Sequence, residues 1–67
     1  MEQMDEKRLV AFEEMLNFVQ SEYDRTAEKM ESLKAEGKEK SATYRQLMGN
    51  KLTYQNMLAM YRLYDLL

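Results

Sequence analysis

At 67 residues, with a net charge of −2 and neither cysteine nor histidine, the chain forms one small domain at most. The missing residue types exclude disulfide bonds, thiolate catalysis and iron–sulfur clusters, and they remove the commonest general base and metal ligand. The acidic balance predicts no bulk attraction to nucleic acid or to an anionic lipid surface. Because a core of this size is marginal alone, we expect oligomerisation to stabilise it.

The composition is helical, with no proline, two glycines, 45% hydrophobic residues and 33% charged residues. The sequence contains no apolar run long enough for a transmembrane span. Its first residues show no basic segment followed by an apolar one, so we expect no secretory signal. A cytoplasmic location therefore fits best.

Apolar side chains recur with unbroken spacings of three and four residues through the first half of the chain. This spacing is typical of an amphipathic helix that packs along another helix, as in a coiled coil. All the positions of this seam except a threonine are apolar or aromatic. They are Leu9, Phe12, Leu16, Val19, Tyr23, Thr26, Met30 and Leu33.

We predict a single helical-hairpin domain over residues 1–67, with a helix over 5–36, a loop over 37–41 and a second helix over 42–66. Gly37 suits the left-handed position that follows a helix, and Ser41 or Thr43 can cap the next one. The charge is −5 over the first 36 residues and +3 over the rest, which favours folding back.

The alternative is one continuous helix, because the spacing of three and four residues continues through the loop. In the loop, however, the positions with this spacing are occupied by glycine and lysine. This argues against a continuous helix, since glycine destabilises a helix interior by about 1 kcal/mol. We therefore favour the hairpin.

The second helix carries the other side of the seam. Folding back about residue 38 pairs Phe12 with Tyr64 and Tyr23 with Tyr54. Lys51 also falls on this phase, and Gly49 is either a weak spot or a close-packing site. The apolar seam positions of the second helix are Tyr44, Leu47, Tyr54, Met57, Leu58, Tyr61 and Tyr64.

Further apolar side chains lie outside this seam, and we expect them at the open end of the hairpin, away from the loop. One hairpin cannot cover them, so they predict an interface. Antiparallel homodimerisation into a four-helix bundle would bury them, and so would another helical protein. The interface residues are Met4, Ala11, Met15, Phe18, Met48, Leu52, Met60, Leu63, Leu66 and Leu67.

No set of residues for catalysis can be assembled. A buried Lys51 could act as a nucleophile, but a stem that reaches solvent or a residue that fixes the helix register is the simpler interpretation. Di-metal helical sites combine glutamates with histidines, which this chain lacks. Residues 57–67 have too few basic side chains for a membrane anchor. We expect neither catalysis nor a cofactor nor a metal.

The sequence thus predicts a small non-catalytic protein-interaction or assembly module, an adaptor or regulator, that acts as a homo-oligomer. The alternative is a nucleic-acid-binding hairpin dimer, in which tyrosines of the second helix stack on bases. Its phosphate contacts would come from Lys38, Lys40, Arg45, Lys51 and Arg62.

Overall fold

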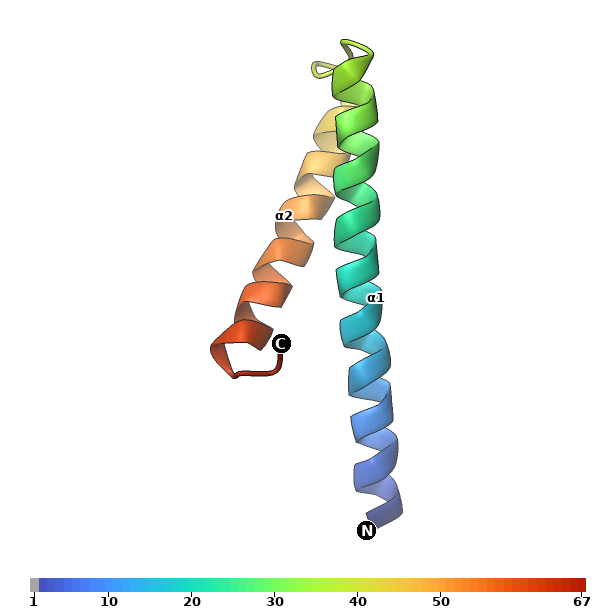
Figure 1. The fold of residues 1–67 in the computed structure, drawn as a ribbon, viewed down its shortest axis with the longest axis vertical. Helices are drawn as coiled ribbons and strands as arrows, with labels where there is room; N and C mark the ends of the chain where they lie inside the picture. The colour runs from blue at the N-terminus through green and yellow to red at the C-terminus, as the bar shows by residue number, and fades with distance from the viewer. Residues whose placement is uncertain (1) are drawn as a thin grey trace.

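The computed structural model describes the backbone of residues 2–67 and the side chains of residues 5–67. It contains helices α1 (Glu2–Ala35) and α2 (Ala42–Leu63), which pack against each other in opposite directions (Figure 1). The all-helical, two-helix prediction is confirmed, and the continuous helix is wrong. The molecule is elongated and measures 53 × 20 × 15 Å.

The turn between the helices closes with the local signals that the sequence provides. Gly37 adopts a φ of 75°, and the N–H of Lys38 donates to the carbonyl of Leu33 at 2.8 Å, which satisfies the end of α1. The Ser41 hydroxyl accepts a hydrogen bond from the N–H of Tyr44 at 3.1 Å and donates one to the carbonyl of Lys38 at 2.8 Å. Ser41 is therefore the cap of α2, as one of the two predictions had it.

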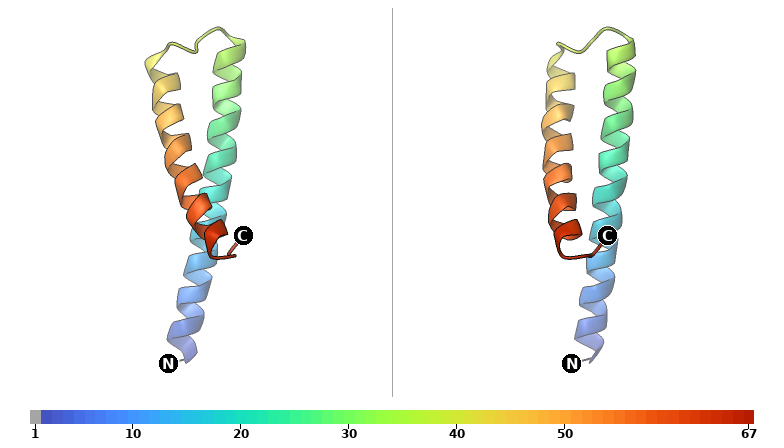
Figure 2. Two further views of the ribbon diagram at one scale, coloured as in Figure 1. Left: turned by 90° about the vertical axis from the view of Figure 1, so that its left-hand side faces the viewer. Right: turned by 60° about the vertical axis from the view of Figure 1, so that its left-hand side comes forward.

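Helix α2 ends at Leu63, three residues before its predicted end. Asp65 adopts a φ of 57°, and the N–H of Leu66 donates to the carbonyl of Tyr61 at 2.9 Å. This is the same left-handed closure that glycine makes after α1, here made by an aspartate. The last residues turn back towards α1 (Figure 2).

The two helices differ in length. With 34 and 22 residues, they extend about 51 Å and about 33 Å at 1.5 Å per residue. The N-terminal part of α1 therefore projects past the end of α2 (Figure 2). Leu9, predicted in the seam, lies on this projection and is 59% exposed. Tyr64 follows the end of α2 and is 73% exposed, so neither residue belongs to the packed seam.

The core consists of α1 side chains on the predicted seam. Leu16, Val19, Thr26 and Met30 are buried, and Val19 is the least exposed at 2%. The remaining seam positions of both helices are half-buried. They are Phe12, Tyr23, Leu33, Tyr44, Leu47, Lys51, Tyr54, Met57, Leu58 and Tyr61.

The register of the two helices differs from the predicted one by about one turn. Phe12 meets Tyr61, not Tyr64, with ring centroids 5.5 Å apart and ring planes at 84°. Tyr23 lies under the Lys51 ammonium, 5.9 Å from its ring centroid. Both pairs place the fold-back point near Gly37 rather than at the predicted residue 38. The left-handed backbone of Gly37 reverses the chain there.

Gly49 lies inside α2 without a structural need for glycine. A Cβ built at this position meets no atom within 4 Å, and its φ is not left-handed. We therefore expect Gly49→Ala to raise the free energy of unfolding by about 1 kcal/mol, because alanine loses less backbone entropy in a helix. A thermal melt followed by circular dichroism measures the change. A lower melting temperature would show that another chain packs closely on Gly49.

Candidate interaction surface

The apolar residues predicted at an interface are exposed on this chain wherever their side chains are described. Phe18 is 58% exposed and Leu63 is 77% exposed, both high values for large apolar side chains. Met4 lies outside the residues whose side chains the structure describes. The other exposed members are Ala11, Met15, Met48, Leu52, Met60, Leu66 and Leu67.

These side chains do not form one patch at the open end. On α1, the residues Ala11, Met15 and Phe18 form a short stripe beside the seam. Further along the helix this stripe gives way to Glu22 and Arg25, which form an ion pair at 3.3 Å. The α1 stripe is thus confined to the half of the helix near the open end.

On α2, a longer stripe lies on the face turned away from α1, about 140° around the helix from the seam at 100° per residue. It consists of Met48, Leu52, Ala59 and Leu63, and all four are exposed. We call it the outer stripe. Met48 begins it within two turns of the α2 N-terminus, close to the loop, so the interface residues of α2 run along the whole helix.

Helix α2 has no buried residue over its entire length. The chain as a whole exposes 5675 Å². A compact protein of 8.1 kDa exposes about 4,500 Å², so this hairpin exposes about 1,200 Å² more. The second helix is therefore covered on one side only, and the other side presents apolar surface.

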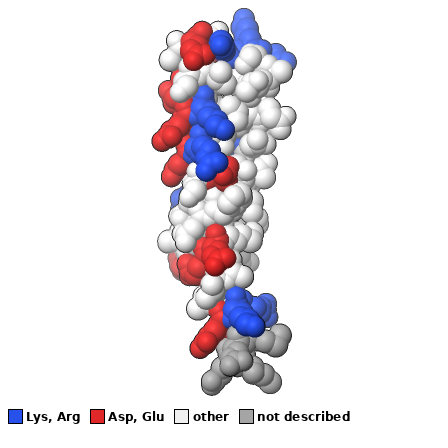
Figure 3. Space-filling model, turned by 90° about the vertical axis from the view of Figure 1, so that its right-hand side faces the viewer, with Lys and Arg blue, Asp and Glu red and all other residues white. Residues whose placement is uncertain are grey.

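Charge is divided between the helices. Helix α2 contains no acidic residue, whereas α1 carries most of the carboxylates. On the face that Figure 3 shows, acidic side chains lie along one edge with basic side chains next to them, and a broad uncharged area lies beside both.

Two of the basic residues considered for phosphate binding contact groups of their own chain. Lys38 pairs with Glu36 at 3.0 Å, and the Lys51 ammonium lies over Tyr23. This cation–π contact gives Lys51 a structural role at its seam position. Arg45 and Arg62 lie about 100° apart around α2 and so do not share one row.

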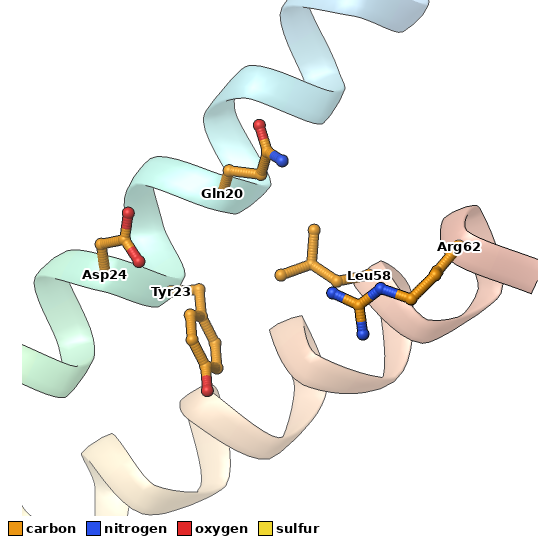
Figure 4. Close-up of a pocket in the computed structure, with 5 residues that line it drawn as sticks. All are labelled: Gln20, Tyr23, Asp24, Leu58 and Arg62. Atoms are coloured by element: carbon orange, nitrogen blue, oxygen red, sulfur yellow. The ribbon is translucent and has the colours of Figure 1, made fainter. Parts of the chain in front are cut away.

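A shallow hollow of about 420 Å³ opens at the edge between the two helices (Figure 4). The side chain of Arg62 extends from α2 towards the side of the hollow where Tyr23 lies. The Tyr23 hydroxyl and the Asp24 carboxylate, the potential nucleophile and the potential base of this hollow, point away from each other in Figure 4. Its lining residues are Gln20, Tyr23, Asp24, Leu58 and Arg62.

Within the described residues, no three acidic side chains are grouped so that they could hold a metal ion. Over the same part of the chain, neither helix has an apolar stretch that could cross a bilayer.

Sequence reasoning identified the exposed apolar residues but placed all of them at the open end of the hairpin. The contrary signal was present in the sequence, because Met48 follows the predicted start of the second helix by only six residues and so lies near the loop. Comparisons with protein-family models, with curated proteins and with solved structures find no match to this chain.

Proposed function

We propose that this chain is a non-catalytic protein-interaction module that acts by self-association, with two hairpins forming a four-helix dimer. The observation that carries the proposal is α2, a helix with apolar side chains on two faces and without a single buried residue. A helix with apolar side chains on two faces needs a neighbour on each, and α1 supplies only one.

The exposed area supports the same proposal. The surplus of about 1,200 Å² over a compact chain exceeds the roughly 800 Å² that each partner contributes to a standard protein interface. A dimer could therefore cover a full interface and leave further surface for another protein. We place the adaptor or regulator role on that remaining surface.

Light scattering across a wide concentration range, with helicity followed by circular dichroism, tests the proposal. We expect twice the monomer mass at high concentration and the monomer mass on dilution, with helicity retained in the separated hairpin. A fully helical monomer at every concentration would contradict self-association. Salt-dependent binding to generic RNA in the same samples would support the nucleic-acid alternative instead.

A further inference from the structure

The outer stripe of α2 is symmetric about its own centre. Met48 and Leu63 are equally distant from the midpoint between Gln55 and Asn56, and so are Leu52 and Ala59. All these side chains are exposed on the face of α2 that α1 leaves open. A helix face with this symmetry matches itself when a second copy is laid on it in the opposite direction.

We propose that the occupant of the outer stripe is the outer stripe of a second copy, antiparallel, with a two-fold axis between residues 55 and 56. This inference rests on the proposed self-association and specifies its surface. Met48 of one copy then faces Leu63 of the other, and Leu52 faces Ala59. A large side chain opposite a small one is the combination that lets packed helices interdigitate.

Polar groups at the centre fit the same arrangement. Gln55 of one copy faces Gln55 of the other on one flank of the stripe, Asn56 faces Asn56 on the other flank, and each carboxamide can both donate and accept hydrogen bonds. A polar residue in an otherwise apolar helix interface fixes the register of the two helices. The two amide pairs would therefore select this alignment over one shifted by a helical turn.

The charge at one end of the stripe favours the antiparallel direction. Arg45 lies on the same face, near the start of α2, and the antiparallel pairing places it at the C-terminal end of the second copy's helix. A cation is stabilised there by the helix dipole. A parallel pairing would instead bring Arg45 to Arg45, and like charges disfavour it.

Disulfide trapping tests the pairing cleanly, because the chain has no cysteine of its own. In the double variant Met48→Cys/Leu63→Cys, the cysteine at position 48 of one copy faces the cysteine at position 63 of the other copy. Within one helix the two positions lie about 22 Å apart, too far for a bond within the chain. We expect mild oxidation to convert most of the double variant to a covalent dimer.

The matched controls are the two single variants, Met48→Cys and Leu63→Cys. Antiparallel pairing keeps identical positions about 22 Å apart along the axis, so each single variant should remain uncross-linked. Cross-linking of a single variant would show a parallel pairing and overturn the inference. A second double variant, Leu52→Cys/Ala59→Cys, should behave as the first one does, and the helicity of each reduced variant checks its folding.

Light scattering on the same proteins separates this inference from the proposal it rests on. A dimer that neither double variant traps would overturn the outer-stripe pairing and leave self-association standing, through the α1 stripe. A monomer at all concentrations would overturn both. A dimer that both double variants trap supports both.

Discussion

Replacing Leu16 by alanine is expected to lower the free energy of unfolding by about 2–5 kcal/mol, the range for removing a large aliphatic side chain from a protein core. Leu16 is one of only three apolar side chains in the described part of the chain that the fold buries. Since a domain of this size has little stability to lose, most of the variant should be unfolded at room temperature. Urea denaturation followed by circular dichroism measures the loss.

The control makes the same chemical change on the same helix. Leu9 was assigned to the same seam from sequence, but it is 59% exposed on the projecting end of α1. Leu9→Ala should therefore change the unfolding midpoint little. Equal losses from the two variants would contradict the position of the core. Val19→Ala and Val10→Ala offer a second matched pair, buried and exposed respectively.

The features that the sequence predicted correctly depend on local signals. The regular spacing of apolar residues predicted α1, because a helix brings residues three and four apart onto one face. Gly37 predicted the end of that helix because it takes a left-handed conformation readily. Ser41 predicted the start of α2 because its hydroxyl can bind a free backbone N–H.

The end of α2 could not be predicted in the same way. Asp65 makes the left-handed closure there, although glycine is the usual residue at this position. A carboxylate at the C-terminal end of a helix is also unfavourable to the helix dipole. Because no glycine marks the end of the helix and the apolar pattern continues, the second helix was predicted to extend to residue 66. Tyr64 was consequently assigned to a seam that ends before it.

The candidate surface shows a different limit. An apolar stripe indicates that a helix face needs covering, but it does not say whether the same chain or another one covers it. The sequence predicted that apolar residues of the second helix outside the seam would be covered at an interface, and the isolated hairpin buries no residue of α2. Only the arrangement of the two helices shows which stripe is left open. Because the structure shows that α1 leaves the outer stripe of α2 uncovered, it identifies that stripe as the candidate interface.

Leu52→Glu should dissociate the self-associated protein while leaving the hairpin folded. Leu52 is 54% exposed on a single chain, so the glutamate stays in water in the monomer and costs little there. In the antiparallel dimer it would face Ala59 of the second copy without a partner for its charge. An unpaired buried charge typically costs about 3 kcal/mol or more, so we expect the dissociation constant to rise at least about 100-fold.

The matched control is Val10→Glu, which introduces the same charge at an equally exposed apolar residue on neither stripe. Sedimentation or light scattering should show a dimer for this control and a monomer for Leu52→Glu at the same concentration, with similar helicity per residue. The decisive comparison adds Phe18→Glu on the α1 stripe. If Phe18→Glu dissociates the protein and Leu52→Glu does not, the second copy binds α1, and the outer stripe of α2 is left for a different partner.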